Sequence, residues 1–195
     1  MAAKNYLTYG ILLIILTTIF ATFTAIYSGG FNVVILRCFG GFWLIGLLLL
    51  VWGLVKFFTR KTIGVPDLIL SKEPLQLGDR FTLNYRHQFP QKITIEHFTI
   101  RLIFRETATS GSGTSEETAV HEKIIADYQI SGGDFRAGHP ISESYNMQIP
   151  VDAMHTFQVF RNRIQWIIRV EANIPNLPNF IEEKEIVVLP KVIRS

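Results

Sequence analysis

The feature that most constrains this chain is a run of 22 residues, Tyr6 to Tyr27, that contains no charged side chain. A helix rises about 1.5 Å per residue, so this run would extend roughly 33 Å and could cross the hydrocarbon core of a bilayer. A second uncharged run, Cys38 to Val55, continues into Lys56-Phe57-Phe58, where the lysine amine can reach the interface. The pattern predicts two transmembrane helices, at about residues 6–27 and 38–58, in an N-terminal hairpin of residues 1–61.

The connection between the two runs favours a hairpin that stays attached to the chain. Residues 28–32, Ser-Gly-Gly-Phe-Asn, are typical of a tight turn. A cleaved signal peptide is the alternative, but its apolar core usually has roughly 7–15 residues, fewer than the first run. Since a second apolar run follows almost at once, we expect an uncleaved membrane anchor.

Charge is divided unevenly along the chain. Residues 1–61 hold five basic residues and no acidic one, whereas residues 62–195 hold all 16 acidic residues and 14 of the 19 basic ones. The C-terminal part is therefore slightly acidic, which argues against nucleic-acid binding despite the net charge of +3.

The positions of the N-terminal basic residues predict an orientation. Only Arg37 belongs to the connection between the two runs, and the other four flank them: Lys4, Lys56, Arg60 and Lys61. Basic residues are enriched on the cytoplasmic side of spanning helices. We therefore expect a two-span protein of the bacterial inner membrane, with both termini and the C-terminal domain on the cytoplasmic side.

Small residues recur at helical spacing in both apolar runs. Thr17, Ala21 and Ala25 lie four residues apart in the first, and Gly46 and Gly53 lie a heptad apart in the second. Small side chains let helix backbones approach closely. These faces could pack against each other within the hairpin, or they could dock onto another integral membrane protein.

Beyond residue 62 the apolar residues alternate with polar ones, which is the pattern of half-buried strands. The alternation is clear in three segments and weaker in four: Arg80–Phe89, Phe98–Arg105 and Ile164–Glu171, then Asp67–Ser71, Thr118–Ile130, Ser142–Ile149 and Ile181–Leu189. No comparable helical pattern occurs there. Residues 62–195 are thus predicted to form one soluble all-β domain, an antiparallel immunoglobulin- or arrestin-like β-sandwich, with a barrel as the main alternative.

Glycine-containing segments between these strands are predicted to be turns or loops. They are Leu77-Gly78-Asp79, the polar stretch 110–115 and Ser131-Gly132-Gly133-Asp134. The single cysteine, Cys38, lies in the second apolar run, so the β domain has no disulfide.

The C-terminal part carries a recognisable arrangement of four segments. They are residues 150–157 (PVDAMHTF), 162–170 (NRIQWIIRV), 174–180 (IPNLPNF) and 186–190 (IVVLP). The arrangement resembles bacterial membrane proteins of unknown function that place an arrestin-like β-sandwich after two spanning helices. The resemblance implies that the strand with Trp166 pairs with the final strand, which ends in Val-Leu-Pro, and that the domain binds or scaffolds proteins.

Candidate catalytic and metal-binding residues are sparse. The five histidines show none of the short spacings of metal ligands: His87, His97, His121, His139 and His155. Cys38 is placed in the membrane, where a thiol does not readily ionise, and no Gly-x-Ser-x-Gly motif is present. The sequence therefore predicts a protein that is not an enzyme and that has no cofactor or metal.

Two groups of residues are candidate contact sites. The basic residues Lys56, Arg60, Lys61, Arg161 and Arg163 could meet lipid headgroups or a partner, although an ordinary turn is the simpler interpretation of 161–163. In a separate position, Ile103 and Ile167 fall on the otherwise polar faces of their strands. If those strands are neighbours, the two isoleucines could form part of an apolar contact patch.

These observations favour a non-catalytic function. The first hypothesis is a membrane-anchored interaction module, an accessory or assembly subunit of a larger membrane complex. The alternative is a membrane-tethered sensor of a ligand, a lipid or an ion.

Overall fold

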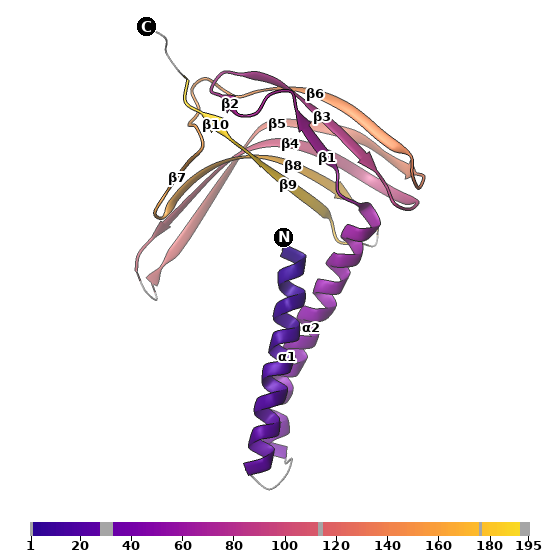
Figure 1. Cartoon of the computed structure of the whole chain (residues 1–195), viewed down its shortest axis with the longest axis vertical. Helices are drawn as coiled ribbons and strands as arrows, with labels where there is room; N and C mark the ends of the chain where they lie inside the picture. Colours follow the sequence, from indigo (N-terminus) through magenta and orange to yellow (C-terminus); the bar gives the residue numbers. More distant parts are fainter. Residues whose placement is uncertain (1, 28–32, 113–114, 176, 192–195) are drawn as a thin grey trace. The chain divides into compact units, whose positions relative to one another are not determined.

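The computed structural model describes residues 2–27, 33–112, 115–175 and 177–191, and it divides into two compact units, residues 1–61 and 62–195 (Figure 1). The side chains of residues 2–7 and 33–39 lie outside the described part. The predicted turn at 28–32 and the side chains of Lys4, Arg37 and Cys38 are therefore not among the described features.

The first unit consists of two helices, α1 (Ala2–Tyr27) and α2 (Val33–Ile63). By length and composition, Thr8–Tyr27 and Gly40–Ile63 are each long and apolar enough to cross a membrane. α2 continues beyond the predicted end at residue 58 and stops at Gly64, whose φ of 82° belongs to the left-handed region that ends many helices.

Several threonine hydroxyls in the helices donate to backbone carbonyls of the same helix. The Thr17 hydroxyl donates to the Leu13 carbonyl at 2.7 Å, and Thr59 donates to Val55 at 2.9 Å. Thr22 makes the same bond one turn back. In these bonds the hydroxyl donors are satisfied by the helix backbone, without water.

The second unit is built from short and long strands. Their bounds are β1 (Asp67–Leu70), β2 (Leu75–Gln76), β3 (Arg80–Gln88), β4 (Ile93–Ser110), β5 (Glu117–Phe135), β6 (Pro140–Gln148), β7 (Phe157–Val159), β8 (Asn162–Asn173), β9 (Phe180–Ile186) and β10 (Val188–Leu189). All seven predicted segments contain a strand. β2 and β7 were not predicted, because two or three residues are too few to show alternation.

Two open sheets account for most of these strands. The smaller has the order β1-β3-β6; the larger has the order β5-β4-β8-β7, with β9 also paired to β8. Neighbours within both are antiparallel, whereas β10 pairs with β2 in parallel. The domain is therefore a mostly antiparallel sandwich of open sheets and not a closed barrel.

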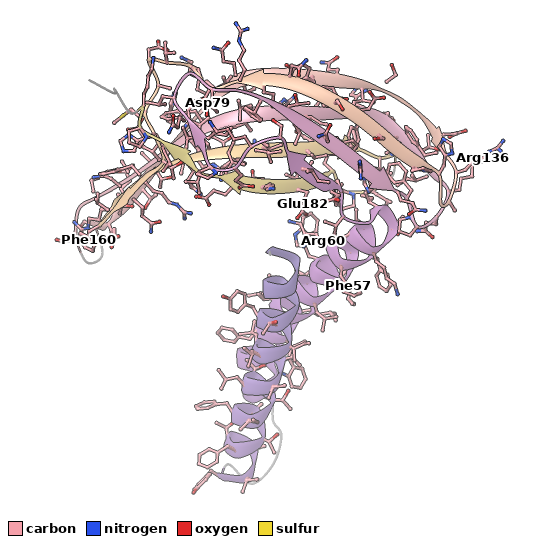
Figure 2. All side chains as sticks on the ribbon, turned by 45° about the horizontal axis from the view of Figure 1, so that its top comes forward. Phe57, Arg60, Asp79, Arg136, Phe160 and Glu182 are labelled. Carbon is pink, nitrogen blue, oxygen red and sulfur yellow. The ribbon has the colours of Figure 1, made fainter. Side chains whose placement is uncertain are left out.

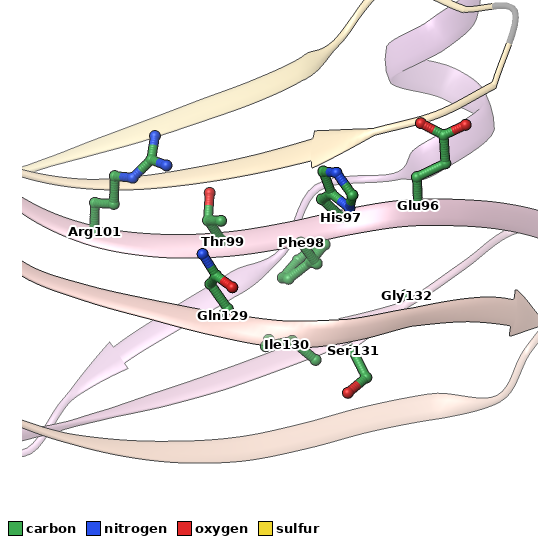
Figure 3. Close-up of a pocket in the computed structure, with 9 residues that line it drawn as sticks. All are labelled: Glu96, His97, Phe98, Thr99, Arg101, Gln129, Ile130, Ser131 and Gly132. Atoms are coloured by element: carbon green, nitrogen blue, oxygen red, sulfur yellow. The ribbon is translucent and has the colours of Figure 1, made fainter.

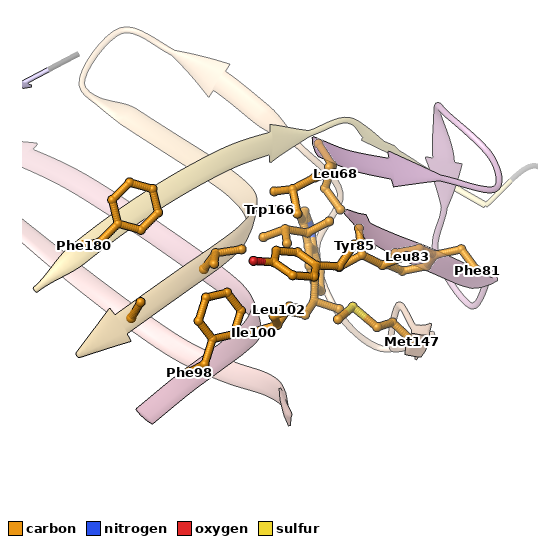
Figure 4. Close-up of a cluster of buried hydrophobic side chains, with 14 of the residues drawn as sticks. Leu68, Phe81, Leu83, Tyr85, Phe98, Ile100, Leu102, Met147, Trp166 and Phe180 are labelled. Atoms are coloured by element: carbon orange, nitrogen blue, oxygen red, sulfur yellow. The ribbon is translucent and has the colours of Figure 1, made fainter. Parts of the chain in front are cut away.

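One hydrophobic core joins the two sheets (Figure 4). The smaller sheet contributes Phe81, Leu83, Tyr85 and Met147, and the larger contributes Phe98, Ile100, Leu102, Trp166, Ile168 and Val170. Trp166 is fully buried, and its indole nitrogen donates to the Met154 carbonyl at 3.0 Å. Burial of alternate residues from both sheets is the arrangement that the period-two pattern predicts.

The structure corrects the predicted turn at Ser131–Asp134. These residues belong to β5, where Ser131 pairs with His97 and Gly133 with Ile95. A Cβ on Gly132 would lie 2.1 Å from the Glu96 carbonyl oxygen, so glycine is needed here for close strand approach rather than for a turn.

The end of the chain also departs from the expectation based on resemblance. β9 pairs with the Trp166 strand, with Ile186 opposite Trp166. The following Val188 and Leu189 leave that pairing and join β2 instead. The Val-Leu segment therefore links the edge of the larger sheet to a separate two-stranded pairing.

Candidate functional site

The small-residue faces of the helices lie inside the helical unit. Thr17, Ala21 and Ala25 are buried on α1, and Gly46 and Gly53 are buried on α2. This burial matches the packing of the two faces within the hairpin, one of the two alternatives that the sequence left open.

The two helices also approach closely at Gly10, a glycine that the sequence pattern did not single out. A Cβ on Gly10 would lie 3.0 Å from the Gly46 carbonyl oxygen, and a Cβ on Gly46 would lie 2.7 Å from Cγ1 of Ile14. Gly10 precedes Thr17 by one heptad, so a heptad search of the first run would have found it.

The basic residues near the end of α2 have interface chemistry. The Lys56 amine lies 5.5 Å from the ring centroid of Trp52, which allows a cation–π contact. Arg60 and Lys61 occupy the last turns, where a positive charge favours the helix C-terminus. Aromatic and basic residues together are typical of a membrane–water boundary.

The predicted contact residues Arg161 and Arg163 have different environments. Arg163 is paired with Glu185 at 2.8 Å, so its charge is compensated within the sandwich. Arg161 lies in the turn between β7 and β8, and its guanidinium carbon is 5.0 Å from the Phe160 ring centroid. Its Nε is buried without a hydrogen-bond partner among the described residues.

Strand β7, the turn that follows it and the first residues of β8 make up residues 157–164, which are called the tip hairpin from here on. Val159 pairs with Asn162, which leaves Phe160 and Arg161 as a two-residue turn. Arg161 has a φ of 72°, a conformation that glycine or asparagine normally occupies, and its carbonyl accepts a 2.8 Å hydrogen bond from the amide of Thr109.

The tip hairpin exposes apolar side chains. Phe160 is 85% exposed, and Phe157 and Val159 are 40% and 47% exposed. Figure 2 shows Phe160 at the end of the projecting strands of the sandwich. The sequence indicated a turn at 161–163 and a candidate headgroup contact at Arg161. The structure adds the exposure of Phe160, because residue types alone do not show which side chains of a turn face the solvent.

Four charged side chains form a closed ring of ion pairs on the outer face of the larger sheet, called the charged ring here. Arg105 on β4 lies 2.6 Å from Glu122 on β5 and 2.8 Å from Glu183 on β9. Arg169 on β8 contacts the same two carboxylates, at 2.8 and 2.6 Å. The hydrogen bonds from Arg169 and Arg105 hold the pKa of Glu122 below its usual range.

The charged ring explains why the predicted apolar patch is not exposed. Ile103 and Ile167 are direct cross-strand partners, as a neighbouring pair requires, but they are only 1% and 2% exposed. The Arg105–Glu183 pair passes over β8, which carries Ile167, since β8 lies between β4 and β9. The two isoleucines therefore form a covered pair and not an exposed contact patch.

A shallow hollow of about 570 Å³ lies along β4 and β5 (Figure 3). Its lining is mainly polar: Glu96, His97, Phe98, Thr99, Arg101, Gln129, Ile130, Ser131 and Gly132. Arg101 is already paired with Glu171 at 3.1 Å and lies 3.3 Å from Asp127. Within the described residues no group of three histidine, cysteine, aspartate or glutamate side chains could hold a metal ion.

His87 is a buried polar residue in the sandwich core and not a ligand in an open site. Its Nε2 lies 2.8 Å from the Ile63 carbonyl, which can only accept, so Nε2 carries the proton. Its Nδ1 accepts from the Tyr85 hydroxyl at 2.6 Å. Burial lowers the pKa of His87, which keeps the ring neutral, although the bond to Ile63 opposes this shift.

Comparison with known proteins assigns no family to the chain. Neither a family model nor a curated protein sequence matches it. Among solved structures, the sporulation control protein Spo0M from Bacillus subtilis matches with a TM-score of 0.48 and 14% sequence identity, over 65% of this chain and 50% of that one. The aligned part thus spans about half the length of Spo0M, and a similarity at this level assigns no function.

Proposed function

We propose that the chain is a membrane-anchored interaction module, in which α1 and α2 span a bacterial inner membrane and the sandwich binds protein partners without catalysis. The arrestin-like character implied by the sequence resemblance is part of this proposal. The alternative function, a sensor of a ligand, a lipid or an ion, stays a prediction.

The observation that carries the proposal is the apolar surface of the helices. Only 22% and 11% of the two candidate spans is buried. Large apolar residues are exposed around both helices, among them Leu16 at 66%, Ile19 at 63%, Leu44 at 64% and Leu48 at 69%. A helix that is apolar on all sides requires an apolar surrounding, and a bilayer provides it.

The sandwich supports binding rather than chemistry. Its charged side chains in the charged ring are mutually compensated, and the hollow on β4 and β5 is shallow and polar. Exposed apolar side chains occur instead on strands of both sheets, among them Ile69 at 40%, Ile124 at 53% and Ile181 at 53%. Residues that offer contact area without an arranged nucleophile, acid or base fit an accessory or assembly subunit.

Membrane integration and orientation are tested first. The full chain should remain in the membrane after an alkaline carbonate wash. A single cysteine at Ser142, introduced into a Cys38→Ser chain, should react with an impermeant maleimide in inside-out vesicles and not in intact cells. Release by carbonate would contradict the anchor, and labelling in intact cells would contradict the cytoplasmic orientation.

Partner binding is tested by the mass of the complex. After extraction in mild detergent, the tagged full chain should run as a complex of fixed stoichiometry, whose partner is then identified by mass spectrometry. A matched chain with Ile124→Ser and Ile181→Ser should keep its fold, because both side chains are 53% exposed, and should lose part of the complex. A monodisperse chain free of any partner would contradict the interaction module.

A further inference from the structure

The tip hairpin combines features that point to one occupant. Phe160 has the highest exposed fraction of any large apolar side chain in the described part of the chain. Phe157 and Val159 add exposed apolar surface on the same hairpin, and residues 157–164 contain no acidic side chain. An exposed aromatic group beside an uncompensated arginine has the chemistry of side chains at a membrane–water interface.

The backbone of the turn holds Phe160 outward. Arg161 keeps a φ of 72°, which is unfavourable for a residue with a Cβ, and the Thr109 amide fixes its carbonyl. The guanidinium lies beside the Phe160 ring and does not pair with Glu185, which is engaged by Arg163. Strain retained at an exposed turn, together with a bulky apolar side chain that contacts water, indicates a binding role.

We propose that the tip hairpin inserts Phe160 into the surface of an anionic bilayer, with Arg161 at the headgroups. The proposal rests on the membrane anchor proposed above. Burial of one phenylalanine gives a preference of roughly ten- to a hundredfold for the bilayer over water. That is too weak for a free protein, but it is sufficient for a domain already tethered, because the tether supplies a high effective concentration.

The charges support a lipid surface over a protein groove as the occupant. The predicted basic pair Arg161 and Arg163 is reduced to one uncompensated charge, since Glu185 neutralises Arg163. A single cation beside a phenylalanine suits a bilayer surface, because the guanidinium can contact the headgroups while the aromatic ring enters the hydrocarbon below them. Insertion is therefore expected to be driven mainly by Phe160 and strengthened by anionic lipid through Arg161.

Depth-dependent quenching in proteoliposomes tests the proposal with the full chain. A fluorophore is attached to a single cysteine in the Cys38→Ser background, at Asn162 on the tip hairpin, at Ser142 on β6 or at Leu48 on α2. The vesicles contain roughly three parts phosphatidylcholine to one part phosphatidylglycerol, so that anionic headgroups are present. One set of vesicles contains a lipid with a nitroxide near the headgroup, which reports on Asn162 and Ser142, and a second set contains a lipid with a nitroxide deep on the acyl chain, which reports on Leu48.

The expected result is strong quenching at Asn162, several-fold above that at Ser142, which Phe160→Ser reduces to the level of Ser142. Phe160→Ser should leave the unfolding midpoint unchanged, because the side chain is exposed. Arg161→Gly, which suits the positive φ, should reduce quenching only when phosphatidylglycerol is present. The Arg161→Gly result therefore measures the contribution of the arginine charge separately from that of the apolar contact made by Phe160.

Two outcomes separate failure of this proposal from failure of the anchor. Quenching at Leu48 with none above the Ser142 level at Asn162 would leave the anchor intact and overturn insertion of the tip. If Asn162 is then also shielded from iodide, protein covers the tip hairpin in place of lipid, either the chain's own residues or a second copy of the chain. Absence of quenching at Leu48 would overturn the anchor itself.

Discussion

The helical unit and the sandwich place their apolar side chains in opposite ways. In the helices, large apolar side chains are exposed, and threonine hydroxyls bond to carbonyls of their own helix. In the sandwich, apolar residues from both sheets are enclosed, and arginine and glutamate side chains face outward. One chain thus carries an apolar surface on its helices and a charged surface on its sandwich, and the apolar surface is the one that the proposed membrane anchor requires.

The interiors of the two units differ as well. The sandwich is held by large interlocking side chains around Trp166, whereas the helices approach each other through glycines and alanines. Large apolar side chains suit the core of a domain in water, because burial of their apolar area is favourable there. Small groups suit helices in lipid, where close backbone contact has to replace the hydrophobic effect.

The largest expected effect comes from removing a side chain of the sandwich core. Trp166→Ala should destabilise the sandwich by about 3–5 kcal/mol, because it leaves a cavity and deprives the Met154 carbonyl of its donor. Urea unfolding of the full chain in detergent, followed by circular dichroism of the β structure, measures the change. Trp52→Ala on α2, where the side chain is 50% exposed, is the control and should leave that transition in place.

The pairing of the two helices should be weakened by a larger side chain at their contact, rather than by the loss of a side chain. Gly46→Leu should cost about 1–3 kcal/mol of helix pairing, since even a Cβ there would lie 2.7 Å from Ile14. Spin labels at Ile19 and Leu44 should report a longer and broader distance distribution. Gly41→Leu is the matched control, because a Cβ at Gly41 meets nothing within 4 Å; equal effects of the two variants would contradict the glycine contact.

The stability of the sandwich should also depend on pH, through the buried His87. The pKa of His87 is lowered by burial, so the unfolded chain binds a proton near pH 6.5 that the folded domain does not bind. Its contribution is present above pH 6.5 and is lost as the pH falls toward the folded pKa, with a slope approaching about 1.4 kcal/mol per pH unit.

Urea unfolding at a series of pH values between neutrality and pH 5 measures this slope. His87→Gln should flatten it, at the cost of the bonds to Tyr85 and Ile63. His121→Gln, at an exposed position, is the control and should keep the slope of the unchanged chain. A slope that is the same in all three chains would contradict a neutral, buried His87.

The smallest effect is expected at the tip hairpin, where the sandwich exposes apolar surface as the helices do. Arg161→Gly should stabilise the sandwich by about 0.5 kcal/mol, because relief of the positive φ exceeds the loss of the contact with Phe160. Thermal unfolding measures the shift. Arg163→Gly should instead destabilise the domain, since it weakens β8 and leaves Glu185 without its arginine.

The sequence by itself determined the features that depend on local pattern. Uncharged runs predicted two helices long enough to span a membrane, and period-two alternation located the longer strands. The turn at Leu77–Asp79 was also predictable, and Gly78 has a φ of 87° there. Each of these depends on residues close together in the chain, so its physical cause can be read directly from the sequence.

Tertiary structure alone decided what lies across from each residue. Alternation placed Ile103 and Ile167 on one face, but only strand order put Arg105 and Glu183 above them. The glycines at 132 and 133 predicted a turn, but in the structure they belong to β5, where the Glu96 carbonyl oxygen lies against Gly132. Alternation in the sequence predicts the face of the sheet on which a side chain lies, but not the residue that lies next to it on the neighbouring strand. Strand pairing joins residues far apart in the sequence, and the whole fold selects their register.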